Sequence, residues 1–349
     1  MIKIMSTWKK FSEIDNSYQE KKILMAKELV NSDCLWVVTE KIDGENASIN
    51  ITNDGTVRIG KRSSLLGENE NFGKVRDFAN HYKTALEYVK HRIALKYPSF
   101  ISFTIYGESF GGVYGHKDIE RVQGAKKIQG RVHYCPHNDF MPFDISVMYS
   151  DLEGNEIHEY LDYDFFQEIL SIHCIPRIKT LFIGTLDECL NYNEVFETTI
   201  PSYYGLPKIK DNFAEGIVIK PLKEHRFGNG ERVIFKKKSE SFAEKMKSKK
   251  VITEKEKIEL PSQVIEAIEI VSQYITPNRL SNVMSHHGEL TEKDFGMILK
   301  DMNEDVLKDS IKENEEFFSS LSTDEMKIVR KSINSDCAKM MKTEFFKHL

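Results

Sequence analysis

Hydrophobic and polar positions follow two patterns along the chain, and the change falls between about residues 240 and 255. Before the change, short runs rich in β-branched and aromatic residues alternate with turn residues, which is typical of β-strands. A hairpin is predicted where ASINIT and TVRIGKR flank Asn53-Asp54-Gly55. The other predicted strands are LWVVTEKID (35–43), ISFTIYGESF (101–110), FMPFDISVM (140–148), EGIVIKPL (215–222) and RVIFKKK (232–238).

Two helices are predicted among these strands. One fits KKILMAKELV at residues 21–30, because Ser17 and Glu20 before it have the spacing of a capping box. The other fits YDFFQEILSIH at residues 163–173. Roughly the first 240 residues therefore combine strands with interspersed helices.

From about residue 255 to the end, only helix patterns occur. One helical face is formed by Val264, Ile268, Val271 and Ile275, and helix starts are predicted at Thr276-Pro277, at Thr291 with Asp294, and at Ser322 with Glu325. We therefore predict an α+β protein. Antiparallel sheets with flanking helices occupy residues 1–243, a lysine-rich linker follows at 244–257, and a small all-α domain covers 258–349.

Composition limits the possible functions. With 349 residues, 40% hydrophobic and 30% charged, the chain predicts a globular protein with a substantial core. No apolar run approaches the roughly 20 residues of a membrane helix, and the N-terminal stretch resembles neither a signal peptide nor a transit peptide. We therefore expect an intracellular, cytoplasmic protein, in the host cytoplasm if it is viral. Five scattered cysteines without a CxxC pair argue against disulfides and a zinc cluster.

Charge is unevenly distributed along the chain. The formal net charge is −5, yet residues 236–250 hold seven lysines against two glutamates, so this stretch is +5 and the remainder is −10. Taken alone, the stretch is equally consistent with a solvated linker and with a contact for nucleic acid.

Four stretches at predicted strand ends carry candidate chemistry: Lys41-Ile42-Asp43-Gly44, Tyr106-Gly107-Glu108, Glu215 to Lys220, and Lys236-Lys237-Lys238. A KxDG motif alone is weak evidence for a catalytic lysine, but the four stretches in this order are stronger evidence. A lysine can act as a nucleophile only when its amine is neutral, and nearby cations or burial favour that form. Because side chains alternate along a strand, Lys236 and Lys238 share a face and Lys237 points away. Of the three lysines, we therefore expect Lys237 to be dispensable for the chemistry.

This ordered set resembles the covalent nucleotidyltransferase superfamily, which contains nucleic-acid ligases and mRNA capping enzymes. Within it, the chain is most similar to the RNA ligase 2 family of phage RNA-nick-sealing enzymes and kinetoplastid RNA-editing ligases. The similarity runs nearly end to end, through KKFSEIDNSY, YGESFGG, IQGRVHYCPHNDFMPFDI, FKKKSESFAEK and TPNRLSNVMSHHG.

The resemblance implies an RNA ligase that uses ATP and Mg²⁺, with Mn²⁺ as a substitute, in RNA repair or editing. Lys41 would attack the α-phosphate of ATP, the adenylate would pass to an RNA 5′-phosphate, and a 3′-hydroxyl would displace AMP to seal a nick in duplex RNA. Residues 1–243 would be the adenylyltransferase domain, and 258–349 would engage RNA. The partners would be nicked double-stranded RNA and ATP, with no membrane; protein partners are not predicted.

Site roles follow from the same resemblance. Glu108 would bond the ribose, Phe143 would stack on adenine, and Glu215 would engage the metal; packing in the core is the alternative for Phe143. The catalytic residues would be Lys41, Glu215, Lys236 and Lys238. ATP would be bound by Glu40, Lys41, Ile42, Asn46, Arg62, Glu108, Phe143, Lys236 and Lys238, and RNA by Lys61 and Arg62.

Two positions depart from the family pattern. Phage relatives often have histidine at the position of Asp43 and arginine at that of Thr39. Asp43 matches the KxDG pattern of the superfamily. Thr39 has no basic group, so the chain lacks a cation at this position beside the nucleophile, and we expect 5′-phosphate binding to be altered. His286-His287 is most simply a polar loop.

Two other functions compete with this interpretation. The first is an ATP-dependent DNA ligase or an mRNA guanylyltransferase of the same superfamily, which usually has a C-terminal OB barrel that would need strands after residue 250. The second is a catalytically silent RNA-end-binding protein, which would have no need to keep all of Lys41, Glu108, Glu215, Lys236 and Lys238.

Overall fold

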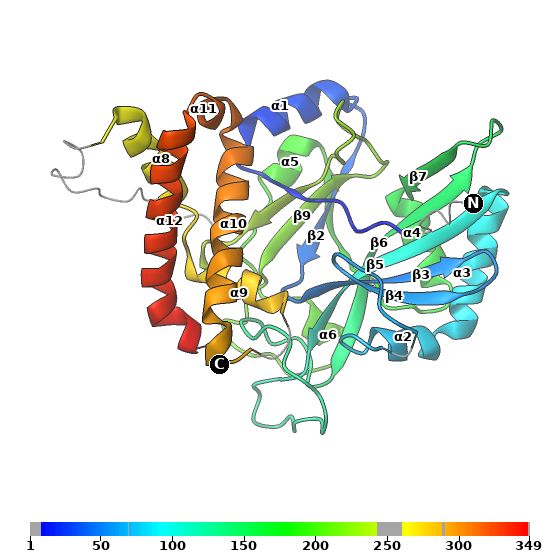
Figure 1. Ribbon diagram of the computed structural model, residues 1–349. Coiled ribbons are helices and arrows are strands. Elements are labelled where there is room, and N and C mark those ends of the chain that lie inside the picture. The colour runs from blue at the N-terminus through cyan, green and yellow to red at the C-terminus, as the bar shows by residue number, and fades with distance from the viewer. Residues whose placement is uncertain (1–7, 69, 243–259, 288–289, 348–349) are drawn as a thin grey trace. The chain divides into compact units, whose positions relative to one another are not determined.

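A computed structural model describes residues 8–68, 70–242, 260–287 and 290–347 (Figure 1). The chain forms two compact units, Met1–Ser239 and Glu240–Leu349. The predicted lysine-rich linker at 244–257 lies outside the described residues. The predicted domain boundaries stay predictions.

The first unit contains two five-stranded sheets. All neighbouring strands are antiparallel except β1 and β10, which run parallel. The first sheet has the order β1 (Asp15–Asn16), β10 (Phe235–Lys238), β9 (Gly216–Pro221), β2 (Trp36–Lys41) and β8 (Thr180–Gly184). The second has the order β4 (Val57–Lys61), β3 (Glu45–Thr52), β5 (Phe100–Gly111), β6 (Asn138–Ser150) and β7 (Glu156–Tyr160).

The KxDG stretch crosses from one sheet to the other. The first sheet's strand β2 ends at Lys41, and the second sheet's strand β3 begins at Glu45, so only three residues connect them. Gly44 is required by close packing, because a Cβ atom there would lie 2.3 Å from the Ser109 carbonyl oxygen. Two backbones therefore approach closely at Gly44, and the candidate nucleophile lies where the sheets meet.

The predicted hairpin is present in the second sheet. Ile51 pairs with Val57 across the turn, and Gly55 has a φ of +87°, a conformation that side chains disfavour. The first unit also contains α1 (Glu20–Leu29), α2 (Val75–His81), α3 (Lys83–Lys96), α4 (Tyr163–Ser171), α5 (Leu186–Leu190) and α6 (Ile200–Tyr203).

The predicted capping box at Ser17 is wrong. Helix α1 begins at Glu20 with Gln19 as its N-cap, and no side chain caps it. The Ser17 backbone N–H instead donates to the Lys236 carbonyl oxygen at 2.9 Å, because residues around β1 pair with β10. Sheet pairing therefore overrides the local capping pattern.

The second unit is helical throughout its described residues. Its elements are η1 (Glu240–Phe242), α8 (Ser262–Ser272), α9 (Pro277–Ser285), η2 (Glu292–Asp294), α10 (Phe295–Glu313), α11 (Glu315–Ser319), α12 (Thr323–Glu344) and η3 (Phe345–Lys347). The Thr276 and Ser322 side chains cap the predicted helix starts by accepting from the backbone N–H groups of Arg279 and Glu325. At Thr291, the Asp294 carboxylate accepts from the Thr291 backbone N–H and hydroxyl, each at 2.8 Å. Val264, Ile268, Val271 and Ile275 are all buried, although Ile275 lies beyond the end of α8. The predicted α+β fold class is confirmed.

Candidate active site

Three adjacent strands bring the candidate lysines together around one glycine. Gly216 at the start of β9 pairs with Lys41 on β2 and with Lys238 on β10. Its φ is +153°, and a Cβ atom would lie 2.1 Å from the Lys237 carbonyl oxygen, so only glycine fits between the lysines. Residues directly opposite one another in a sheet point to the same face, so the two lysine side chains project from one face of the sheet.

Glu215 is bound by both lysines. Lys41 Nζ lies 2.6 Å from Glu215 Oε2, and Lys238 Nζ lies 2.8 Å from Oε1. Burial alone would raise the pKa of Glu215, but the ammonium groups of Lys238 and Lys41 outweigh it and lower this pKa to about 2. The carboxylate is therefore ionised at neutral pH. The Lys41 side chain remains 20% exposed and Glu215 only 3%, so the amine is the accessible partner.

Glu108 reaches the same cluster from the second sheet. It lies on β5 opposite Asn46 of β3. Burial raises the pKa of Glu108 to about 8; Lys41 and Arg62 oppose the shift, and Glu215 adds to it. These electrostatic interactions place Lys41, Glu215 and Arg62 in the neighbourhood of Glu108, which binds a proton at neutral pH.

Glu40 uses its side chain within the protein. Its carboxylate is buried and accepts hydrogen bonds from the Thr198 hydroxyl and from the Thr199 backbone N–H and hydroxyl, the last two at 2.8 and 2.7 Å. Burial raises the pKa of Glu40 despite these bonds. Only the backbone of Glu40 is left to contact a nucleotide. The neighbouring Ile42 side chain is buried in the core.

Phe143 on β6 is half-buried. Phe11 lies edge-on to it, with ring centroids 5.0 Å apart and an interplanar angle of 70°. Phe143 packs against a buried cluster of Phe11, Tyr106, Tyr160 and Ile234. The core contact therefore exists, and it supports the ring from one side. Stacking of Phe143 on adenine stays a prediction.

Lys61 and Arg62 are exposed at the end of β4, where Lys61 pairs with Ala47. Lys61 Nζ lies 5.4 Å from the centroid of the Phe72 ring. The two basic side chains are available at the rim of the second sheet. Asn46, on the neighbouring strand, is half-buried.

The three lysines of β10 alternate in direction. Lys236 pairs with Val218 and Lys238 with Gly216, so the two share a face. Lys237 Nζ donates instead to the carbonyl oxygens of Leu190 and Tyr192, at 3.0 Å each, and lies 2.9 Å from Glu194.

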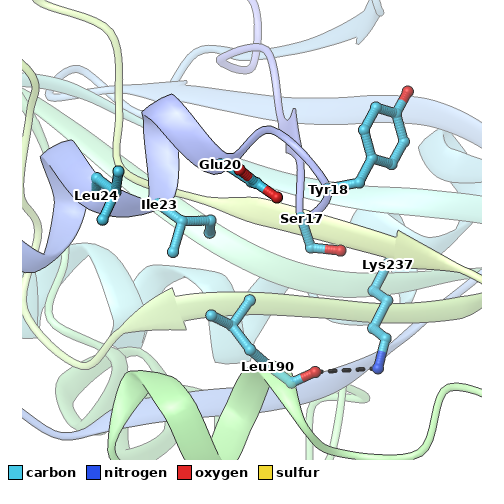
Figure 2. Close-up of a pocket in the computed structure, with 7 residues that line it drawn as sticks. All are labelled: Ser17, Tyr18, Glu20, Ile23, Leu24, Leu190 and Lys237. Atoms are coloured by element: carbon cyan, nitrogen blue, oxygen red, sulfur yellow. Dashed lines mark hydrogen bonds between the residues drawn. The ribbon is translucent and has the colours of Figure 1, made fainter.

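Lys237 belongs to a different feature, an open groove of about 450 Å³. Figure 2 shows Lys237 pointing to Leu190, opposite the side chains of α1. The groove is lined by Ser17, Tyr18, Glu20, Ile23, Leu24, Leu190 and Lys237. None of the predicted site residues lines it, so the candidate active site is defined by its charged cluster and not by this groove.

Two site residues were missed by sequence reasoning, Arg131 and Tyr134. The Asp43 carboxylate accepts from Arg131 Nη2 at 2.6 Å and Nε at 3.2 Å, and the Asp43 backbone N–H donates to the Tyr134 hydroxyl at 2.7 Å. Both residues lie in the stretch IQGRVHYCPHNDFMPFDI, which carried the family resemblance without a role for either. Burial, followed by Glu215, raises the pKa of Asp43, and Arg131 and Lys41 oppose this shift.

Metal ligands are few around this cluster. Among residues 8–68, 70–242, 260–287 and 290–347, no group of three or more His, Cys, Asp or Glu side chains is arranged to hold a metal ion. His287 Nε2 lies 2.9 Å from Asp301 Oδ2 in the helical unit.

All five cysteines are free thiols. No helix in the described part of the chain is long and apolar enough to cross a membrane.

Several known proteins are similar to this chain. RNA-editing ligase 1, mitochondrial, from Trypanosoma brucei brucei is 28% identical over 340 residues, covering 80% of this chain and 70% of the relative. RNA-editing ligase 2, mitochondrial, from the same organism is 24% identical over 358 residues, covering 89% and 84%. A Naegleria gruberi RNA ligase solved with ATP and Mn has a TM-score of 0.45 at 17% identity, covering 68% of this chain and 58% of that one.

Two family models match separate parts of the sequence. The model described as RNA ligase matches residues 35–238, which is more than half of the chain, and the model described as T4 RNA ligase 2 C-terminal matches residues 258–339. The predicted enzyme class, an RNA ligase, is confirmed by this match. The chain belongs to the RNA ligase family, as a member of its RNA ligase 2 group.

Proposed function

We propose that this RNA ligase uses ATP to seal nicks between a 3′-hydroxyl and a 5′-phosphate in duplex RNA, through a Lys41-AMP intermediate. One observation carries the proposal. Lys41 Nζ lies 2.6 Å from a buried Glu215 carboxylate that Lys238 also binds, and the lysine is the accessible member of the cluster.

Formation of the lysyl-adenylate begins with the Lys41 amine in its neutral form. The Nζ lone pair attacks the α-phosphorus, a P–N bond forms, the bond from that phosphorus to the β-phosphate oxygen breaks, and pyrophosphate leaves with the electron pair. The amine proton passes to solvent. Glu215 orients the amine, because its carboxylate stays ionised and accepts a hydrogen bond from Nζ.

Lys236 and Lys238 would stabilise the negative charge that develops on the phosphates. Both project from the same face of β10, and Lys238 is held beside the nucleophile through Glu215. Fixed cations at the position where charge develops lower the barrier without reorganisation during the reaction. Lys237 would take no part, because it bonds to Leu190, Tyr192 and Glu194.

Glu215 would be the protein ligand of a divalent ion that also binds the phosphates of ATP, and its carboxylate would then share the ion with the two lysines. Mg²⁺ commonly binds through one or two carboxylates and keeps several waters, so a larger protein cluster is not required. The ion would neutralise phosphate charge, and Mn²⁺ would substitute for it.

The nucleoside would be held from the second sheet. A protonated Glu108 is able to donate a hydrogen bond to a ribose hydroxyl, Arg62 reaches the same region, and Phe143 offers an aromatic face for adenine. Ile42 and the backbone of Glu40 would complete the adenine side, and Asn46 stands opposite Glu108.

RNA would be bound at the rim of this site. Lys61 and Arg62 are exposed, and guanidinium groups are suited to phosphate oxygens. The adenylate then passes to the RNA 5′-phosphate, and the 3′-hydroxyl attacks that phosphorus and releases AMP. The helical unit would contact the phosphate backbone and so give salt-sensitive binding, whereas 2′-hydroxyls around the nick would favour RNA.

The test is nick sealing by the purified full-length chain with ATP and Mg²⁺. A labelled RNA nick with a 5′-phosphate should be joined, a nick with a DNA 3′-hydroxyl strand should be joined more slowly, and GTP should not replace ATP. Joining of DNA alone would favour a DNA ligase. Transfer of GMP would favour a guanylyltransferase, and RNA binding without joining or covalent AMP would favour a silent end-binding protein.

The place of action stays a proposal. We expect the cytoplasm, and the two trypanosome relatives are named mitochondrial. Fractionation of the source cells with an antibody to this chain would separate the two locations. The physiological RNA would then be sought in the compartment where the protein is found.

A further inference from the structure

Asp43 lies beside the nucleophile and has one strong partner from a distant part of the chain. Arg131 holds both carboxylate oxygens of Asp43, with Nη2 at 2.6 Å from Oδ1 and Nε at 3.2 Å from Oδ2. This two-point geometry is specific to arginine, since a lysine offers a single ammonium group. The Asp43 side chain is 4% exposed and that of Arg131 is 24% exposed, so the carboxylate is buried and the guanidinium lies at the surface of the site.

The segment that carries Arg131 is firmly anchored. Asn212 accepts a hydrogen bond from the His133 backbone N–H at 2.9 Å and donates one to the His133 carbonyl oxygen at 2.7 Å. Tyr134 is buried and accepts a bond from the Asp43 N–H. Arg131 therefore reaches the nucleophile loop from a fixed backbone.

The charges around Asp43 explain why a partner is needed. Its carboxylate interacts electrostatically with Glu215, which disfavours a second negative charge, and with Lys41. Glu108 also interacts with Asp43. Without Arg131, a buried carboxylate would compete with Glu215 for the Lys41 amine and would repel the phosphates of ATP. The guanidinium removes both effects.

We propose that Arg131 is a positioning residue for lysyl-adenylate formation, which acts by neutralising Asp43 and holding the loop between β2 and β3. The inference rests on the proposed function and deepens it.

The experiment measures the rate of covalent AMP formation as a function of ATP concentration, without RNA, for the full-length chain. Arg131→Ala should reduce the maximal rate by about tenfold to a hundredfold and should raise the KM for ATP, since it leaves a buried carboxylate unpaired. Arg131→Lys should recover part of the loss. Asp43→Asn should lose less than Arg131→Ala, and the double variant Arg131→Ala with Asp43→Asn should return to the level of Asp43→Asn.

The double variant tests charge neutralisation, and thermal unfolding separates it from a merely structural role. If the double variant does not regain the rate of Asp43→Asn, or if Arg131→Ala loses rate only at temperatures at which it unfolds, the proposal is overturned. An unchanged rate in Arg131→Ala would overturn it equally. Arg121→Ala is the matched control, because Arg121 is an exposed arginine on the same segment. Thermal unfolding of every variant identifies any that fails to fold.

Failure of the proposed function has a different signature. A wild-type chain that takes up no AMP, after bound AMP has been discharged with pyrophosphate, contradicts lysyl-adenylate formation itself, and the role of Arg131 falls with it. A labelled wild type with an equally labelled Arg131→Ala contradicts only the role of Arg131.

Discussion

Two clusters in the first unit each combine one carboxylate with two cations, and only one of them has an accessible lysine. Glu215 is held by Lys41 and Lys238, whereas Asp144 is held by Lys220 Nζ and Arg232 Nη1, each at 2.7 Å from Oδ2. Lys41 and Glu215 lie at strand ends, but Lys220 is inside β9 and Asp144 inside β6.

The difference between the two clusters is access. The side chain of Lys41 is 20% exposed and that of Lys220 is 6% exposed. Burial lowers the pKa of Lys220 to about 8, although Asp144 opposes the shift, so a search for perturbed lysines alone would choose Lys220. Yet Lys220 lies 5.3 Å from the centroid of the Tyr163 ring and 5.7 Å from that of Phe166, and its side chain is almost fully covered. A favourable pKa is therefore insufficient without a route to the substrate.

The largest expected effect on activity comes from the cluster of Lys41, Lys238 and Glu215. Lys41→Ala should lower covalent AMP formation by more than about a thousandfold, because it removes the attacking atom itself. The unfolding temperature should fall moderately, because the buried Glu215 carboxylate then keeps only Lys238 as a partner, so labelling is measured well below that temperature. Retained activity in this variant would assign the nucleophile to another lysine and would contradict the claim that access distinguishes Lys41 from Lys220.

The second effect compares neighbouring lysines of β10. Lys238→Ala should slow AMP formation by about a hundredfold to a thousandfold, since a cation beside the reacting phosphate is lost. Lys237→Ala, which removes a lysine from the opposite face, should change the rate by less than about threefold. Single-turnover labelling of the two variants in parallel measures both. Equal losses would mean that the face of the strand does not decide the role.

The third effect is on stability and concerns the cluster of Lys220, Arg232 and Asp144. Lys220→Met should cost about 2–3 kcal/mol of unfolding free energy, because Asp144 then keeps only Arg232 as a partner. It should still form covalent AMP. Urea denaturation followed by tryptophan fluorescence gives the free energy. A stable variant that cannot be adenylylated would show that Lys220 takes part in the chemistry.

The smallest effect concerns stability and pH. Glu108 has a folded-state pKa raised to about 8 from 4.5, so between these values the folded chain binds a proton that the unfolded chain lacks. Stability contributed by this group is therefore lost as the pH rises through that window. Glu108→Gln should unfold at a higher temperature relative to the wild type at about pH 9 than at about pH 5. A difference that does not depend on pH would contradict the raised pKa.

The sequence predicted the parts of this molecule that depend on local pattern. The hairpin at Gly55 and the capped starts at Thr276 and Ser322 follow from turn and capping residues a few positions apart. Alternation along a strand separated Lys237 from Lys238 correctly. The family motifs predicted that Lys41, Glu108 and Glu215 belong to one site, and their catalytic roles stay predictions.

What the sequence did not provide depends on contacts between distant segments. Arg131 is 88 residues from Asp43 and sits in a loop without a periodic pattern, so only the folded chain reveals the pair. The Ser17 capping box failed because pairing of β1 with β10 decides the backbone there. Access to Lys41 and burial of Lys220 also follow from tertiary packing, since both lysines fall within predicted strands of the sequence.

The most direct test of the central claim is to locate the covalent AMP on the chain. Wild-type protein is labelled with ATP and Mg²⁺, digested at neutral pH to preserve the phosphoramidate bond, and mapped by mass spectrometry. The account predicts one AMP group on the peptide that contains Lys41 and none on the peptide that contains Lys220. AMP on Lys220, or on any lysine other than Lys41, would contradict it.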